Sequence, residues 1–446
     1  MSKYVMKFGG TSLKDATAIE RAHKIVKDFY GKNNPDQLII VVSAAGKLGD
    51  GPLEDKVTDL LENIYRNENP IASKNEVIRR YKDIAETFDV FSPDDLLQEL
   101  SEENSSGSDK DYSRIVSYGE RLSSQIVNAV FSKDLESIVL DYDQFGMVTL
   151  GDRDAVASYD STYEIERQLK RKGPIVVLPG FLGYNSNGEV TTLGRDGSNY
   201  TATKVGEAIL TQGVFIFSDE PGVRRANPKI VSDAEVLKEM SYNEAIEFAE
   251  LGAKIINAKS IEPAKNQNIP IHIVDERYKG TTISGNVSLE HQGAKIIASS
   301  PNHSILSIHY DTDKPGVLAD VAKKFADSKI NIECIADERH ALSVAYLSSS
   351  KGDLSKLLRH FDSSYKLSLE NSFARISIIG EEMRNQVGVL AKIAQSFQDG
   401  GISIEMISQA LTQLNVTTFV PQEYERIAVK RLYDDLFRNN GNSSDE

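Results

Sequence analysis

The chain has 446 residues, of which 40% are hydrophobic and 26% charged, and its formal net charge is −15. This composition is typical of a globular protein with two to four domains and excludes a disordered or fibrous chain. The acidic balance argues against a surface for nucleic acid or anionic lipid, because both need clustered Lys and Arg. One cysteine, Cys334, excludes an intrachain disulfide, and no Cys/His grouping has zinc-site spacing. The start lacks a signal pattern and the apolar runs are too short to span a membrane, so a cytoplasmic location is expected.

Residues 3–44 predict a strand, a glycine turn, a helix and a second strand. Apolar residues recur at helical spacing from Leu13 to Phe29, and the run 38–42 is typical of a buried strand. Similar runs follow at 137–142, 174–180, 214–219 and 270–275. Short apolar strands alternating with helices indicate an α/β fold with a mainly parallel sheet that is covered on both faces.

Residues 66–112 interrupt this alternation with a polar, acidic stretch. The segment 76–88 predicts a helix, and an acidic run extends from there to residue 112. The stretch carries twelve acidic and six basic residues, which is more than half of the excess negative charge of residues 1–301. We interpret it as an inserted helical lobe that ends in a mobile acidic loop, a solvated surface away from any site.

The last third of the chain contains an internal repeat. Residues 315–335 recur at 387–407, with identical residues at eleven of twenty-one positions. Each copy predicts a glycine-led loop, an amphipathic helix and a strand, and the flanking β-type runs complete a small α+β unit. The duplication indicates a paired regulatory or binding module, with a duplicated packing domain as the alternative.

The segment 7–12, Lys-Phe-Gly-Gly-Thr-Ser, stands at a predicted strand-to-helix turn. Two glycines let the backbone approach an anion, a helix N-terminus supplies free N–H groups, and Lys7 adds a positive charge. The spacing GxxxxGK[ST] is missing, so the turn is not a Walker A motif.

Two further loops carry candidate polar groups. The loop 192–199 precedes a predicted helix at 200–209 and combines Arg195 with Asp196, which suits a substrate that has both a carboxylate and an amine, although a helix-capping turn is the alternative. In the segment 215–229 a strand ends and leads to a basic cluster, at the position where open α/β sheets bind ligands. Solvated arginines on a surface turn are the alternative for that segment.

Together these segments resemble the aspartate kinases of the amino acid kinase family over essentially the whole chain. The 72-residue repeat is similar to the tandem ACT domains of that family. The matching segments are 7–12 (KFGG[ST]S), 43–47 and 54–61 (SAxGK and TDLL), 119–120 (GE), 195–199 (RGGSD), 218–229 (TDVxGIYxxDPR) and 251–254 (FGAK).

Several positions depart from the family pattern. In the RGGSD loop, Asp196 replaces Gly and Asn199 replaces Asp, and Arg224 stands where the family has a nucleotide-contacting Tyr. Asn227-Pro228-Lys229 replaces DPR, and Asn257-Ala258 replaces His-Pro. Asn199 keeps the hydrogen bonds of the family's Asp but loses its charge, so we expect catalysis to survive at a reduced rate.

The resemblance implies a fold and a domain organisation. The fold is an amino-acid-kinase-like three-layer α/β sandwich with a mainly parallel central sheet, followed by two α+β ACT domains of the ferredoxin-like type. The implied ranges are 1–298 for the catalytic domain with the insertion 66–112, then 302–370 and 371–446 for the two ACT domains. Small ACT sheets have unpaired edges, so we expect a homodimer or a dimer of dimers joined through them.

The resemblance also implies a reaction, the transfer of the γ-phosphoryl group of MgATP to the β-carboxylate of L-aspartate. The product is 4-phospho-L-aspartate, the first intermediate of lysine, threonine and methionine biosynthesis. The acceptor carboxylate is already ionised at neutral pH, so no general base is needed. ATP and Mg²⁺ are the implied cofactors, with the ion carried mostly by ATP phosphates and water. Another amino-acid or carbamate kinase, and a non-catalytic amino-acid-binding protein of the same fold, are the alternatives.

The family's residue roles transfer to matching positions. Arg195 holds the α-carboxylate of the substrate and Glu120 its α-ammonium group. The implied catalytic residues are Lys7, Lys254 and Asn199, and the implied aspartate-binding residues are Thr58, Glu120, Arg195, Asp196, Gly197 and Ser198. The implied ATP-binding residues are Lys7, Gly9, Gly10, Ser218, Asp219, Arg224, Lys229 and Lys254.

An amino-acid effector, lysine or threonine, is implied for the first ACT domain. The implied effector residues are Asp311, Asp313, Gly316, Val317, Leu318, Asn331, Ile332 and Glu333.

Overall fold

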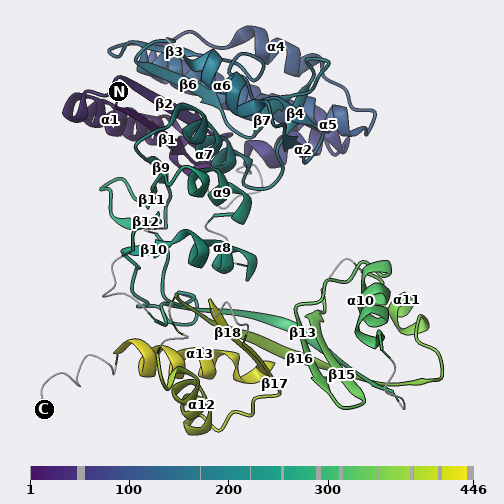
Figure 1. Ribbon diagram of the computed structural model, residues 1–446. Helices are drawn as coiled ribbons and strands as arrows, with labels where there is room; N and C mark the ends of the chain where they lie inside the picture. Colours follow the sequence, from purple (N-terminus) through teal and green to yellow (C-terminus); the bar gives the residue numbers. More distant parts are fainter. Residues whose placement is uncertain are drawn as a thin grey trace, which may run out of the picture. The chain divides into compact units, whose positions relative to one another are not determined.

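The computed structural model describes residues 2–47, 56–170, 172–220, 222–252, 256–287, 293–310, 315–349, 352–381, 383, 386–409 and 414–438. These residues fall into two compact units (Figure 1). The first unit comprises residues 1–223, 236–246 and 254–287, and the second comprises 224–235, 247–253 and 288–446. The division therefore differs from the expected single boundary near residue 298, because two short segments of the kinase-like sequence are packed into the C-terminal unit.

The first unit is built on a central sheet of eight strands within the described residues. The chain direction is parallel between neighbours except where β12 runs antiparallel to β11. The α/β fold with a mainly parallel sheet is thereby confirmed. The order across the sheet is β10 (Glu239–Ser241), β12 (Gly280–Ser284), β11 (Ile271–Val274), β9 (Val214–Phe217), β1 (Lys3–Phe8), β2 (Gln37–Val42), β6 (Ile175–Pro179) and β3 (Ser137–Val139).

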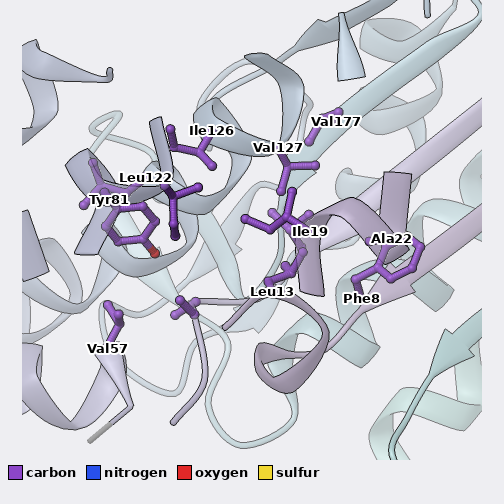
Figure 2. Close-up of a cluster of buried hydrophobic side chains, with 14 of the residues drawn as sticks. Phe8, Leu13, Ile19, Ala22, Val57, Tyr81, Leu122, Ile126, Val127 and Val177 are labelled. Atoms are coloured by element: carbon purple, nitrogen blue, oxygen red, sulfur yellow. The ribbon is translucent and has the colours of Figure 1, made fainter. Parts of the chain in front are cut away.

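Helices cover both faces of this sheet. On one face, α1 (Ala16–Asn33) and α5 (Asp109–Phe131) pack over the strands, and Figure 2 shows Ile19 of α1 among Leu122 and Ile126 of α5, with Phe8 and Val177 of the sheet in the same cluster. On the other face, α7 (Gly197–Ile209) packs against β1 and β9. Both α6 (Ser161–Leu169) and α9 (Ala258–Asn266) lie beside α7, which completes three layers.

Shorter elements connect these layers. They are the 3₁₀ turn η1 (Gly10–Leu13), α2 (Val57–Tyr65), the antiparallel pair β4 (Thr149–Leu150) and β5 (Val156–Ala157), the antiparallel pair β7 (Leu182–Tyr184) and β8 (Val190–Thr192), and α8 (Tyr242–Glu250). In the part of the chain that the structure describes, no helix is both long and apolar enough to cross a membrane.

The insertion is helical over more of its length than predicted. It contains α3 (Pro70–Phe88), α4 (Asp94–Glu102) and the beginning of α5. The prediction of a mobile acidic loop is wrong for 94–102, because Leu96, Leu97 and Leu100 form one apolar helix face that is buried in the main core. The insertion also contacts α5 through a hydrogen bond. The hydroxyl of Tyr81 on α3 donates to the carbonyl oxygen of Gly119 on α5 at 3.0 Å.

The second unit contains an antiparallel sheet of six strands among the described residues. Two long strands, β13 (Ile296–Tyr310) and β16 (Tyr365–Ile379), pair along their length at its centre. The order is β14 (Cys334–Glu338), β15 (Ala341–Leu347), β13, β16, β18 (Asn415–Pro421) and β17 (Met406–Gln409). The helical elements are α10 (Val317–Asp327), α11 (Leu354–Arg359), α12 (Val389–Asp399), α13 (Glu425–Tyr433), the 3₁₀ turn η4 (Gln422–Tyr424) and the π-helical turn η5 (Asp434–Arg438).

Each long strand serves both copies of the repeat. Residues 303–310 of β13 pair with β15 and with the first half of β16, whereas residues 296–300 pair with 375–379 in the second half of β16. The pairing register between β13 and β16 shifts between Ser300 and His303. This shift separates the part of β13 that pairs in the second copy from the part that pairs in the first copy. The second repeat unit, which we call the second module, is therefore discontinuous in sequence. Its sheet includes residues 296–300, and these residues precede the whole of the first repeat unit, the first module. The repeated segments, 315–335 and 387–407, do not include residues 296–300, so the repeat gives no sign of this pairing.

Two segments of the kinase-like sequence, 224–235 and 247–252, belong to the second unit. In 224–235, Ala226, Ile230, Val231 and Ala234 are buried in one cluster with residues of α12, α13 and β16. The hydroxyl of Tyr433 accepts a hydrogen bond of 2.9 Å from the backbone N–H of Glu235. The second segment, 247–252, comprises the last turn of α8 and the two residues that follow it.

Candidate active site

The glycine turn after β1 brings two backbone segments into contact. The N–H of Gly46 donates to the carbonyl oxygen of Gly10 at 2.8 Å, and a Cβ atom on Gly10 would lie 2.8 Å from the carbonyl oxygen of Ala44. Such an approach requires glycine. The turn therefore places Gly9 and Gly10 beside Lys7, whose Nζ lies 3.5 Å from the position of a Cβ on Gly9.

The loop that precedes α7 presents the N-terminus of that helix. The helix begins at Gly197, three residues before the predicted start at residue 200. Asp196 immediately before it has φ of 59°, in the left-handed region, which Asp tolerates better than most residues. This explains how Asp can stand where the family pattern has Gly. The first helical N–H groups carry the positive end of the helix dipole.

These two loops line one cavity of about 390 Å³ at the carboxyl ends of the strands. The six predicted aspartate-binding residues and two predicted catalytic residues lie together there, whereas Lys254 lies outside the described residues. The lining residues are Lys7, Ser43, Thr58, Tyr112, Glu120, Asp154, Phe181, Gly194, Arg195, Asp196, Gly197, Ser198 and Asn199.

Burial shifts the pKa values of the charged groups in this cavity. It lowers the pKa of Lys7 to about 8, although the carboxylates of Asp196 and Glu120 oppose the shift. It raises the pKa of Glu120 to about 8, opposed by backbone N–H groups, including that of Ala44 at 3.2 Å from Oε1, and by Lys7. It also raises the pKa of Asp196, against the charges of Lys7 and Arg195. Shifts of this kind cluster at functional sites.

Asn199 offers a buried acceptor to the cavity. Its side-chain Oδ1 has no hydrogen-bond partner among the described residues, while its backbone N–H donates to the carbonyl oxygen of Asp196 at 2.9 Å. A buried amide oxygen without a partner costs free energy, so this atom is available to a ligand that can donate a hydrogen bond.

Sequence reasoning gave no site role to four polar or aromatic residues of the cavity, although Ser43 stands in the matching segment 43–47. Ser43 directly follows β2, and Phe181 lies two residues after β6, so the rule that ligands bind at the carboxyl ends of parallel strands could have found both. Phe181 has φ of 68°, an uncommon value for an aromatic residue, and its N–H donates to Thr201 Oγ1 at 3.0 Å. No sequence signal marked Asp154, and Tyr112 was assigned to the acidic insertion.

The predicted ATP-binding residues are divided between several places. Ser218 and Asp219 line a second cavity of about 370 Å³ at the ends of β1, β9 and β11, together with Arg21 and Arg277. Gly9 and Gly10 lie in the turn after β1, beside Lys7 of the first cavity.

Two further predicted ATP-binding residues, Arg224 and Lys229, belong to the second unit. There Nη1 of Arg224 donates to the carbonyl oxygen of Ala234 at 2.7 Å. The side chain of Lys229 is exposed.

The predicted effector residues lie at two places in the first repeat. Gly316, Val317 and Leu318 begin α10, and Asn331, Ile332 and Glu333 precede β14, whereas Asp311 and Asp313 lie outside the described residues. Oε2 of Glu333 lies 2.8 Å from Nε2 of His303 and 2.8 Å from Nη1 of Arg375. Burial raises the pKa of Glu333, but the hydrogen bond from His303 and the charge of Arg375 outweigh it and hold the pKa below its usual value.

Comparisons with known proteins extend over nearly the whole chain. The aspartokinase of Geobacillus stearothermophilus is 27% identical over 97% of both chains. Aspartokinase III of E. coli, solved with aspartate and ADP, has a TM-score of 0.75 at 23% identity and covers 98% of this chain and 100% of its own. The aspartate kinase of Clostridium acetobutylicum has a TM-score of 0.83 at 21% identity, over 97% and 99% of the two chains. These structural likenesses establish the fold.

The family comparison matches two parts of the chain. Residues 376–436 match the ACT domain, and residues 2–275 match the amino acid kinase family. The match to the amino acid kinase family runs from β1 to the carboxyl end of β11 and includes every described residue of the first cavity. The chain therefore belongs to the amino acid kinase family and carries an ACT domain near its C-terminus.

Proposed function

We propose that this protein is an aspartate kinase, which transfers the γ-phosphoryl group of MgATP to the β-carboxylate of L-aspartate and forms 4-phospho-L-aspartate. The observation that carries the proposal is the first cavity, where Lys7, Arg195, Glu120 and Asp196 meet the N-terminus of α7. The cavity thus offers cationic and anionic groups to a substrate that itself carries two carboxylates and an ammonium group.

The acceptor is recognised by groups of both signs. Arg195 provides a planar fork of donors that fits the α-carboxylate with two hydrogen bonds. Glu120 on α5, once ionised, binds the α-ammonium group. Thr58 on α2 and Ser198 on α7 supply hydroxyl groups at the same cavity.

The chemical step depends on positioning and positive charge. The acceptor carboxylate is ionised at neutral pH and attacks the γ-phosphorus directly, so no base has to remove a proton. Lys7 and the N-terminus of α7 stabilise the charge on the transferred phosphoryl group, and Lys254 provides a second cation by analogy with the family. Asn199 accepts a hydrogen bond through its unpartnered Oδ1 and orients these cations without adding charge.

ATP and its Mg²⁺ ion bind to groups that neighbour the aspartate-binding residues. Gly9 and Gly10 hold the phosphates, while Ser218 and Asp219 bind the nucleotide at the second cavity. The assignment of Arg224 and Lys229 to the nucleotide rests on the family resemblance alone. Mg²⁺ neutralises phosphate charge when it is bound. Oxygen donors suit this ion, and the carboxylate of Asp196 is one such donor in the cavity of Lys7.

The relatives support a proposal for the regulation and biological role of this protein. Their aspartokinase names, and the aspartate and ADP in the E. coli structure, support the proposed substrates. We propose that lysine or threonine binds the first ACT module as a feedback effector, and that the protein acts as a homodimer or dimer of dimers in the cytoplasm. The product would enter lysine, threonine and methionine biosynthesis.

One feature supports a second candidate, an amino-acid-binding regulatory protein without catalysis. The buried residue at the end of the 195–199 loop is Asn199, where the family pattern has Asp. A chain of this kind would bind amino acids and fail to turn over ATP.

Formation of aspartyl hydroxamate separates the two candidates. The full-length protein is incubated with MgATP, hydroxylamine and L-aspartate, and with L-glutamate as the control acceptor. The aspartate kinase proposal predicts ATP-dependent hydroxamate from aspartate and little from glutamate, whose extra methylene displaces the reacting carboxylate. Absence of hydroxamate together with measurable amino-acid binding would establish the second candidate instead.

A further inference from the structure

A third cavity, of about 310 Å³, is lined by residues of α7, α9 and β5. The two helices pack side by side (Figure 1). Tyr200, Lys204 and Glu207 line the cavity from α7, and because they are three or four residues apart they share one face of that helix. Every lining residue is described, and all of them belong to the first unit.

Two backbone segments in close contact separate this third cavity from the first. The N–H of Ala155 donates to the carbonyl oxygen of Thr192 at 2.7 Å. Two residues further on, a Cβ atom on Gly194 would lie 2.6 Å from Oδ1 of Asp154, so the segments approach closely there as well. The wall between the two cavities is therefore only as thick as the chain itself.

Neighbouring residues of this wall line opposite cavities. Asp154 lines the first cavity and Ala155 the third. In the same way, Gly194 lines the first cavity and Leu193 the third. Arg195 lines both cavities, so a ligand on either side can reach this side chain.

The third cavity offers charged groups of both signs. Within the part of the chain that the structure describes, Arg195, Lys259 and Glu262 form no ion pair. Lys204 and Glu207, in contrast, bind each other at 2.6 Å. Lys259 stands in the first turn of α9, where the helix dipole disfavours a cation, so an anionic ligand would improve its electrostatic environment.

The same cavity also offers apolar surface and a polar atom without a partner. Val156, Leu193 and Pro263 line it, and Val156 is 61% exposed, so a ligand with an apolar group gains free energy by covering this side chain. Ser260 is another lining residue, and its buried hydroxyl has no hydrogen-bond partner among the described residues. The volume is at the lower end of the range for small-molecule sites, about 300–1,000 Å³.

We propose that the third cavity binds a free amino acid with an apolar side chain, which competes with aspartate for Arg195. Its carboxylate binds Arg195 and Lys259, its ammonium group binds Glu262, and its side chain covers Val156. The competition rests on the proposed function, which assigns Arg195 to the α-carboxylate of aspartate, whereas binding itself does not depend on catalysis.

The test uses L-leucine as the probe and the full chain as the protein. Isothermal titration calorimetry measures binding, and hydroxamate formation measures inhibition. K259Q and E262Q each remove one charge from the third cavity. K265Q is the matched control, because Lys265 is exposed on the same helix and does not line the cavity. E120Q alters the first cavity alone, and 4-methylpentanoate, which is leucine without its ammonium group, serves as the matched ligand.

We expect K259Q and E262Q each to raise the Kd for leucine about tenfold, the effect of one charge-assisted hydrogen bond, with turnover in the absence of leucine unchanged. K265Q and E120Q should change this Kd less than about twofold. The wild type should bind 4-methylpentanoate about tenfold more weakly than leucine. Leucine should raise KM for aspartate without changing kcat, and aspartate should raise the Kd for leucine in return.

Several results overturn the inference. One is the absence of saturable leucine binding to the wild type up to about 10 mM, a concentration that would saturate a site with a millimolar Kd. Binding that is lost in E120Q and kept in E262Q would place leucine in the first cavity, and binding that neither K259Q nor E262Q weakens would place it outside the third.

The kinetic result separates this inference from the proposed function. Leucine binding that leaves KM for aspartate unchanged would overturn the competition for Arg195. A wild-type protein that binds leucine as expected and gives no turnover would support the third cavity as a binding site and contradict the proposed function. Turnover without leucine binding would overturn this inference alone.

Discussion

Lys7 and Glu120 are oppositely charged groups of one cavity, and burial moves the pKa of each to about 8. The proposed chemistry needs Lys7 protonated for the phosphoryl group and Glu120 ionised for the α-ammonium group of aspartate. Both requirements are met together only in a limited pH range.

The first prediction concerns the pH profile. As pH rises towards about 8, Glu120 ionises and kcat/KM for aspartate increases, and above about 8 Lys7 loses its proton and kcat/KM falls. The profile is therefore a bell with its maximum near pH 8. In E120Q the acid-side rise disappears and the alkaline fall remains, at a lower maximum. A profile that is flat between pH 6 and 10 contradicts these assignments.

Protein stability provides an independent check on Glu120. Its pKa is raised from the ordinary 4.5, so the folded protein holds a proton that the unfolded chain has already released above pH 4.5. The contribution of this group to the free energy of unfolding is therefore complete below about pH 4.5 and is lost as pH rises to about 8. Urea titrations of the wild type and E120Q should show a difference with that pH dependence.

A second prediction at this scale concerns Arg195. Arg195→Lys replaces a planar fork with a point charge, so one of two hydrogen bonds to the α-carboxylate is lost. We expect KM for aspartate to rise about tenfold, the effect of one charge-assisted hydrogen bond. KM for ATP in the same variant is the internal control and should change little. An unchanged KM for aspartate would remove Arg195 from the substrate site.

At the scale of single elements, α4 shows how the insertion joins the core. Leu100 has no exposed surface and packs with residues of α3 and α5 in the main cluster. On the same helix, Glu102 is exposed to solvent. The acidic side chains of this segment therefore form the outer face of a folded helix, and its leucines support α5, which carries Glu120.

The third prediction follows from this packing. Leu100→Ala should lower the free energy of unfolding by about 2–5 kcal/mol, because it removes buried methyl groups and leaves a cavity. Glu102→Ala, on the exposed side of the same helix, should change it by less than about 0.5 kcal/mol. Urea unfolding of the two variants checks the difference. Equal, small effects would show that α4 is not part of the core.

The elements differ in how well the sequence predicts them. The first strand, the glycine turn and α1 could be predicted, because apolar spacing and two adjacent glycines mark them directly. The cavity residues near these motifs followed from the family resemblance. The start of α7 was placed three residues late because Gly197 and Ser198 are weak helix formers whose helical conformation depends on tertiary packing. The burial of α4 could not be predicted from charge alone, because the segment is rich in acidic residues. Its three leucines at helical spacing were the signal for a buried helix face.

At the scale of the whole molecule, the sequence boundaries of the kinase part and the structural units do not coincide. Residues 224–235 are buried with β16, α12 and α13, and residues 296–300 complete the sheet of the second module. These pairings connect residues far apart in sequence, and neither local propensity nor a repeat reveals them. The kinase-like region thus depends on the second module for the burial of its own residues.

The fourth prediction uses this dependence. A chain that ends at residue 370 lacks the partners of Ala226, Ile230 and Val231 and should lose turnover and tend to aggregate. A chain in which an Asn-Gly turn replaces 302–373 keeps those partners, because residues 300 and 375 are already paired and can be joined by a hairpin. We expect the second chain to remain folded and active. Activity in the truncated chain but not in the excised one would contradict this organisation.

The most direct test of the proposed reaction is observation of the product by phosphorus NMR, with the wild type and Lys7→Ala in parallel. The wild type should convert MgATP and L-aspartate into equal amounts of ADP and an acyl phosphate. Lys7→Ala should give neither product, while its circular dichroism spectrum matches that of the wild type. Wild-type turnover that yields inorganic phosphate without the acyl phosphate would contradict the reaction, and full activity of Lys7→Ala would contradict the site.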